Sequence, residues 1–253
     1  MDKFSTKSKE EIEIMGQCGQ KLARVKKALF EKVAEGVTSW DIEELAVKLI
    51  EKEGAEASFK KVPRFHWATC VNLNAGLVHG IPKKEVVFKK GDIVSVDLGI
   101  YFKGFHTDCS FSKGIDVDSE TEKFLNVGRE ALKNAIDRVI AGNRVYDISE
   151  AIEKTVVSEG YKPIRALVGH GVGRNLHEDP QIPCFLPGAK EESMEIVEGA
   201  TFAIEVMYTQ GSPDLVCQED GWTIATQDGK ISALFEETVA VVDGRPKVLT
   251  DFF

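Results

Sequence analysis

The 253-residue sequence predicts an α+β fold, a curved antiparallel sheet with two pairs of helices on its outer side. A helix–glycine–helix pattern occurs twice, and each copy leads into strands that carry single acidic residues opposite an apolar face. Because neither half could cover its own sheet, we expect both halves to pack into one domain spanning residues 1–253.

The helical pattern relates residues 28–54 to residues 135–160, and the matched pairs are 106 residues apart. The matched pairs are Gly36 with Gly142, Trp40 with Tyr146, Asp41 with Asp147, Ile42 with Ile148, and Glu44 with Glu150. Thr38 and Asp41 have the spacing of a capping box, which predicts a helix start. We expect a pseudo-twofold repeat of about 20–115 and 127–245; chance similarity between two amphipathic helix pairs is the alternative.

The first strands are predicted over 93–101 and 105–111. Apolar residues alternate there with Ser95, Asp97 and Gly99, as in a strand buried on one face. Lys103-Gly104 is a tight-turn signal. The resulting hairpin would bring Asp108 close to Asp97, eleven residues earlier in the chain.

The second half carries acids in the same way. Glu205 lies opposite the apolar residues of 202–207. Residues 222–227 and 231–242, joined at Asp228-Gly229, predict a second hairpin. Glu236 and Glu237 would lie on opposite faces of its last strand, and alternation alone does not choose between them.

These acids predict a metal site. A single acid on a strand is usually solvent-exposed, but several carboxylates on inner strand faces raise one another's pKa and need compensating charge. Two divalent cations would supply it. Oxygen ligands with one imidazole from GHGVGRNLHEDP suit Mn, Fe, Co or Zn, and without thiolate ligands a structural zinc finger is disfavoured. Such a pair activates water for hydrolysis.

Together with these strands, the run CVNLNAGLVHGIP (70–82) resembles the type I methionine aminopeptidases of the pita-bread metallopeptidase fold (creatinase/aminopeptidase). The resemblance spans nearly the whole chain. Glu205 and Glu236 are thirty-one residues apart, which leaves no room for the insertion of the type II enzymes.

The resemblance implies a role for each site residue. Asp97 would chelate one ion, Asp108 and Glu236 would bridge both, and His170 and Glu205 would complete the ligand set. Glu205 would also act as the general base, since a carboxylate beside the attacking water can accept its proton.

Two further histidines are implied to act on the substrate. His177 would contact the scissile carbonyl and His79 the substrate backbone, where neutral imidazoles can donate hydrogen bonds to developing oxyanion charge. The methionine side chain would need an apolar pocket. Its implied lining is Phe59, Val62, Phe65, Cys70, Leu176 and Trp222, for which ordinary core packing is the alternative.

The sequence departs from the family pattern at several of these positions. Val62 and Leu176 stand where aromatic residues are common, Val206 where proline is usual, and Glu237 where histidine is common. Without proline, φ at position 206 is not fixed by a ring. Glu237 adds a negative charge near the site, on the opposite strand face.

The implied function is removal of the initiator methionine from nascent polypeptides, with small second residues preferred, and a transient ribosome contact is left open.

A net charge of −9 disfavours nucleic-acid binding. The five cysteines are odd in number and widely spaced, which indicates a reducing compartment. We expect a cytoplasmic protein without a membrane segment, because the sequence shows neither an apolar leader nor a run of about 18 apolar residues. No heptad pattern suggests obligate association, which favours a monomer. The charge runs at 7–13 and 52–61 are expected to be solvated.

Two other classes remain open. An Xaa-Pro aminopeptidase or prolidase would share similar ligands, although those relatives usually carry a sizeable extra N-terminal domain. A non-enzymatic binding module could keep the fold, although such relatives typically lose ligands.

Overall fold

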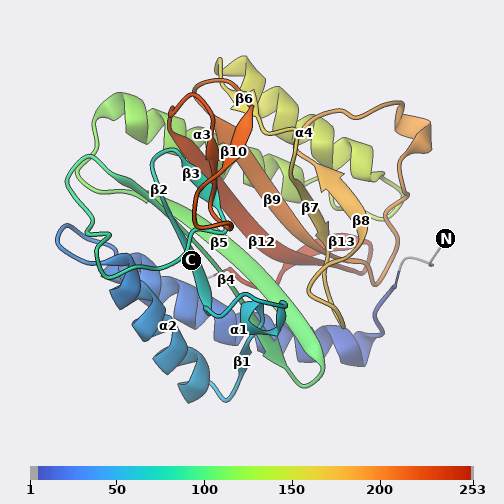
Figure 1. Ribbon diagram of the computed structural model, residues 1–253. Coiled ribbons are helices and arrows are strands. Elements are labelled where there is room, and N and C mark those ends of the chain that lie inside the picture. The colour runs from blue at the N-terminus through green and yellow to red at the C-terminus, as the bar shows by residue number, and fades with distance from the viewer. Residues whose placement is uncertain (1–4, 252–253) are drawn as a thin grey trace.

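The computed structural model describes residues 5–251, and an antiparallel ten-stranded sheet forms its centre (Figure 1). The strand order is β1-β4-β5-β12-β9-β7-β8, with β2 paired to β4, β6 to β9 and β13 to β12. The strands of this sheet are β1 (Glu56–Ala57), β2 (Thr69–Leu73), β4 (Ile93–Phe102), β5 (Phe105–Gly114), β6 (Lys162–Pro163), β7 (Val168–Gly171), β8 (Glu178–Pro183), β9 (Thr201–Thr209), β12 (Ser232–Val242) and β13 (Arg245–Val248).

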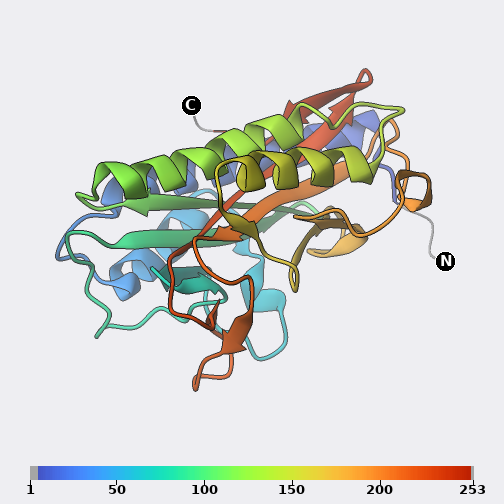
Figure 2. The ribbon, with the colours of Figure 1, turned by 90° about the horizontal axis from the view of Figure 1, so that it is seen from above.

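A smaller three-stranded sheet has the order β10-β11-β3. It consists of β3 (Gly76–Val78), β10 (Leu215–Cys217) and β11 (Ile224–Thr226). Figure 2 shows these strands on the side of the large sheet away from helices α3 and α4. Two short 3-10 helices, η1 (Phe59–Lys61) and η2 (Lys190–Glu192), lie in connections.

Within residues 5–251, four α-helices flank the large sheet in two pairs (Figures 1 and 2). They are α1 (Lys9–Lys32), α2 (Ser39–Lys52), α3 (Ser119–Ile136) and α4 (Val145–Ser158). One apolar core joins α1 and α2 to β4 and β5, and a second joins α3 and α4 to β9 and β12. The predicted arrangement of a sheet with two helix pairs is thus confirmed. No helix within residues 5–251 is long and apolar enough to cross a membrane.

The two helix pairs share local geometry. Gly36 and Gly142 both adopt positive φ, at 81° and 92°, just before α2 and α4. Asp41 accepts a hydrogen bond from the Thr38 backbone N–H, and the matching Asp147 accepts one from Arg144. The predicted capping box at the start of α2 is therefore present. These parallels support the proposal that about 20–115 and 127–245 form an internal repeat within one domain.

The first predicted hairpin is confirmed, and the second is wrong. β4 and β5 pair along their whole length through Lys103 and Gly104, which have φ of 49° and 92°. The turn at Gly229 exists, but β11 before it pairs with β10 and β3, while β12 after it pairs with β9, β5 and β13. A turn signal sets the chain direction locally, whereas tertiary packing chose the partners of both strands.

Candidate metal centre and adjoining cavity

Neighbouring strands bring the four acids to the middle of the large sheet. On β12, Glu236 lies directly opposite Glu205 of β9 and, on its other side, opposite Ser110 of β5. In the first hairpin, Asp97 is paired with Ser110, and Gly99 with Asp108. The acids of both halves therefore converge where β5 and β12 meet.

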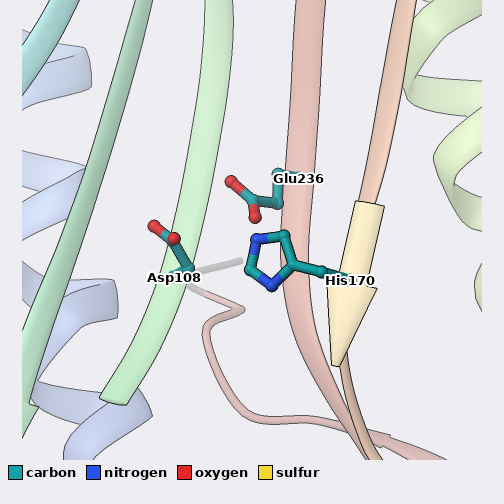
Figure 3. Close-up of side chains that lie close together, drawn as sticks. All are labelled: Asp108, His170 and Glu236. Carbon is teal, nitrogen blue, oxygen red and sulfur yellow. The ribbon is translucent and has the colours of Figure 1, made fainter. Parts of the chain in front are cut away.

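Three side chains at this point are close enough to share one ion. One oxygen each of Asp108 and Glu236 and a ring nitrogen of His170 lie within 4.8 Å of one another. Figure 3 shows the three side chains lying close together, Asp108 on β5, Glu236 on β12 and His170 on β7. His170 Nε2 is also 3.4 Å from Glu205 Oε1, which places a fourth group beside them.

The carboxyl groups are buried without a compensating hydrogen-bond network. Asp97 Oδ1 has no hydrogen-bond partner among residues 5–251. Burial and the charges of Asp108 and Glu205 raise the pKa of Asp97 well above its usual range. Burial also raises the pKa of Asp108 to about 7, and burial with neighbouring acids raises those of Glu205 and Glu236. Bound cations would reverse these shifts, because they favour the charged form.

Burial favours the neutral form of the histidines at the site. Burial and the neighbouring His177 lower the pKa of His170 to about 4. Its Nδ1 lies 2.8 Å from the Gly171 carbonyl oxygen, so a proton placed there leaves Nε2 free to bind an ion. Burial likewise lowers the pKa of His177 and of His79. The rings of His170 and His177 are 4.5 Å apart.

A cavity of about 180 Å³ adjoins the acids, and every site residue expected from the sequence lines it. The residues are Phe59, Val62, Phe65, Cys70, His79, Asp97, Asp108, His170, Leu176, His177, Glu205, Trp222 and Glu236, together with Val78. Val78 was not predicted, although it immediately precedes His79 in the run 70–82. His79 adopts a positive φ of 58° directly after β3.

The apolar lining is separate from the two main cores. Phe59, Phe65, Cys70 and Leu176 form their own buried cluster, against which Val62, Trp67 and Trp222 pack. The Phe65 and Trp222 rings meet edge to face with centroids 5.1 Å apart. These side chains therefore surround a cavity beside the acids rather than fill the space between sheet and helices.

The face of Glu237 is now resolved. Its carboxylate forms an ion pair with Lys26 of α1, at 2.5 Å, and does not line the cavity. Glu236 is the acid that faces Asp108 and His170. The negative charge expected of Glu237 is thus paired with a lysine on the helix side of the sheet.

Two supporting contacts escaped the sequence analysis. Lys7, expected to be solvated, is only 5% exposed, and its Nζ lies 2.5 Å from Glu178, the residue after His177. Glu43 of α2 accepts hydrogen bonds from the backbone of residues 68 and 69, beside the cavity wall. The sequence around Lys7 is a run of charged residues, which gives no signal that Lys7 pairs with Glu178, 171 residues away.

The donors fit a divalent ion, because carboxylate oxygens of Asp108 and Glu236 converge with a free imidazole nitrogen of His170. Asp97 Oδ1, in the same cavity, has no hydrogen-bond partner within residues 5–251. The model of metallopeptidase family M24 matches residues 13–243. The chain belongs to metallopeptidase family M24. It is 37% identical to a methionine aminopeptidase of Clostridium perfringens, over 96% of this chain and 97% of that protein.

Solved structures agree with the sequence comparison. The crystal structure of methionine aminopeptidase from Thermotoga maritima matches with a TM-score of 0.95 and 38% identity, covering 98% of this chain and 99% of that one. A prolidase from Pyrococcus furiosus matches with a TM-score of 0.78 and 21% identity, covering 99% of this chain and 66% of that one. The likeness to the prolidase is one of fold alone, and the pita-bread fold expected from the sequence is confirmed.

Proposed function

We propose that the protein is a methionyl aminopeptidase that removes the N-terminal methionine from polypeptides with the help of two divalent metal ions. The observation that supports this most directly is the shared cavity, in which an apolar cluster adjoins the converging Asp108, His170 and Glu236. The methionine aminopeptidase relatives, which the chain matches over nearly its full length, favour the same reaction.

Five residues would hold the ions, namely Asp97, Asp108, His170, Glu205 and Glu236. Cobalt, manganese, iron or zinc suits this mixture of oxygen and nitrogen donors. When bound, the ions supply Lewis acidity, which lowers the pKa of a water molecule and stabilises negative charge on the scissile carbonyl oxygen.

The side chains around the ions would move the protons. Glu205, which lines the cavity, would accept the proton of the attacking water and return it to the leaving amine. His177 and His79 line the same cavity, and their depressed pKa values keep them neutral. Each can therefore donate an N–H to the substrate, His177 at the scissile carbonyl and His79 at the substrate backbone.

The apolar cluster would select the first residue. Phe59, Phe65 and Trp222 give the cavity aromatic walls, while Val62 and Leu176 supply aliphatic ones. An unbranched thioether adapts to such a mixed wall better than a branched side chain does. Small second residues would be preferred, as the resemblance to the type I methionine aminopeptidases implies.

The natural substrates would be nascent polypeptides that begin with Met. The enzyme would act on them in the cytoplasm as a monomer, in transient contact with the ribosome. All five cysteines are free thiols in the structure, which is in keeping with a reducing compartment.

The deciding experiment measures release of the first residue from Met-Ala-Ser by protein stripped of metal and reconstituted separately with Mn, Fe, Co and Zn. Metal-dependent release from Met-Ala-Ser, and none from Leu-Ala-Ser, is the expected result. Preference for an Xaa-Pro peptide would instead assign a prolyl peptidase. No hydrolysis with any metal, together with tight capture of a protein or RNA by the metal-free chain, would assign a binding module.

A further inference from the structure

The two central strands of the site are joined in an unusual way. β12 pairs with β9 at nine consecutive positions, from Ser232 to Ala240. On its other side, β12 pairs with β5 at one position among the described residues, Glu236 opposite Ser110. These sparsely paired strands carry Asp108 and Glu236, the two acids that would bridge the metal ions.

Two side-chain hydroxyls complete the junction, one from each strand. Thr238 Oγ1 accepts a hydrogen bond from the Asp108 backbone N–H at 2.8 Å and donates one to the Asp108 carbonyl oxygen at 2.7 Å. Ser112 Oγ makes the same pair of bonds with the Leu234 backbone, at 3.0 and 2.9 Å. The two contacts lie symmetrically about the Glu236–Ser110 pair, two residues away on each side.

The backbone of Thr238 cannot replace its hydroxyl. The Thr238 N–H donates to Thr250 Oγ1 at 2.9 Å, and its carbonyl oxygen accepts from the Leu249 N–H at 2.8 Å. Both groups are therefore occupied by the chain that follows β13. The Asp108 N–H and carbonyl on this side depend on the Thr238 hydroxyl, in a setting where both residues are buried.

We propose that Thr238 is a positioning residue, whose hydroxyl fixes Asp108 relative to Glu236 and thereby sets the span between the two bridging carboxylates. The proposal rests on the metal site of the proposed function. Distances from a bound metal to its ligands lie within about 0.2 Å of standard values, so the spacing of the ligands matters. Threonine suits the role because its branched side chain restricts rotation about χ1 and so holds the hydroxyl in place.

The test compares metal affinity among variants by calorimetric titration of Mn into the metal-free protein. Thr238→Val keeps the side-chain shape and removes the hydroxyl. Ser112→Ala is the matched control, since it removes the equivalent hydroxyl from the same strand junction at the end away from Asp108. Thr238→Ser keeps the hydroxyl. Thermal unfolding of each variant shows whether it is folded.

We expect Thr238→Val to bind Mn about 10- to 100-fold more weakly than wild type, the usual cost of losing a partner that orients a ligand. Thr238→Ser and Ser112→Ala should stay within about threefold of wild type, even if Ser112→Ala melts at lower temperature. If Thr238→Val does not fold, Thr238→Ala takes its place with the same expectation.

Two results would overturn the proposal. Wild-type affinity in the Thr238→Val or Thr238→Ala protein would mean that the hydroxyl does not position Asp108. Equal weakening by Ser112→Ala would mean that any loosening of the junction has the same effect. A wild-type protein that binds no Mn would be a different failure, that of the proposed metal site itself.

Discussion

Single side chains decide the chemistry of this site, and the role of Asp108 is the most direct one to test. One of its carboxylate oxygens lies within 4.8 Å of a carboxylate oxygen of Glu236 and of a ring nitrogen of His170. Asp108→Asn keeps the shape of the side chain but removes the charge, so we expect hydrolysis of Met-Ala-Ser to fall by more than about 100-fold, beyond the loss caused by removing a supporting partner. Steady-state kinetics with added Mn measures this.

The control for Asp108→Asn is Asp116→Asn. Asp116 lies on an exposed turn with a positive φ of 45°, which asparagine tolerates well. Turnover of the Asp116→Asn protein should match wild type. If the Asp108→Asn protein also turned over peptide at the wild-type rate, Asp108 would not be a metal ligand.

A second residue-scale prediction concerns the buried pair of Lys26 and Glu237. Both side chains are largely hidden, with exposed fractions of 3% and 14%. Lys26→Met alone leaves the Glu237 carboxylate without this partner, and we expect it to lower the free energy of unfolding by about 3–5 kcal/mol. The double substitution Lys26→Met with Glu237→Leu should recover most of that loss.

Urea denaturation of the single and double variants measures this coupling. Additive losses, with no recovery in the double variant, would argue that the pair is not an interacting unit. Alternation alone did not choose between Glu236 and Glu237, and only the family resemblance implied Glu236. Period two places them on opposite faces, but the face that bears the metal cluster depends on the positions of Asp108 and Glu205 on other strands.

At the scale of elements, prediction from sequence succeeded where the interaction is local. The hairpin of β4 and β5 closes through a two-residue turn, so alternation and turn chemistry together predict its register. β11 instead pairs with β3, about 150 residues earlier in the chain, and no local pattern contains that information. The pairing matters for the site, because β3 and β11 adjoin His79 and Trp222 respectively.

The loop before β11 has an anchor of its own. Asp220 accepts hydrogen bonds from the backbone N–H groups of Trp222 and Thr223, and its other oxygen lies 3.0 Å from Lys83 Nζ. Burial raises the pKa of Asp220, but the hydrogen bonds outweigh it and hold the pKa at about 2. The anchor links the Trp222 wall of the cavity to the segment that follows His79.

Asp220→Asn should therefore loosen the methionine pocket. We expect KM for Met-Ala-Ser to rise by roughly three- to tenfold, corresponding to about 1 kcal/mol, with kcat little changed. The depressed pKa stabilises the wild-type fold above pH 3.8, and this contribution is lost as the pH falls toward 2. The free energy of unfolding of the Asp220→Asn protein should therefore fall less between pH 3.8 and pH 2 than that of the wild type.

Kinetics at neutral pH and unfolding measured between pH 2 and 5 check the two effects of Asp220→Asn. Asp228→Asn is the control, since Asp228 anchors a turn in the same way, through the N–H groups of Ser212 and Lys230, but does not line the cavity. An equal rise of KM in the Asp228→Asn protein would show that the effect of Asp220→Asn on KM does not act through Trp222.

On the scale of the whole molecule, the acids of the site come from both halves of the chain, and the two cores meet where β5 and β12 adjoin. Asp97 and Asp108 belong to the first half, and Glu205 and Glu236 to the second. The sequence could predict that the halves converge, because each ends in acid-bearing strands. It could not predict the hydroxyls that join them, since threonine is enriched in strands generally and a serine or threonine in a strand carries no signal of its partner.

Metal removal should consequently weaken the molecule as a whole. Without cations, buried carboxylates from the two halves face one another across the junction, and the raised pKa values of Asp97, Glu205 and Glu236 report that repulsion and burial. A ligand at 100 times its Kd stabilises the folded state by about 2.7 kcal/mol. For a domain of this size we expect Tm to fall by roughly 5–10 °C when the metal is stripped.

Calorimetric melting of the metal-free protein, with and without added Mn, measures the shift. The Asp108→Asn protein is the control, because it lacks one of the acids that would bridge the ions, so Mn should raise its Tm by much less. A Tm that does not respond to metal in the wild type would mean that the two halves are joined by packing alone. A full shift in both proteins would place the bound metal somewhere other than the junction of β5 and β12.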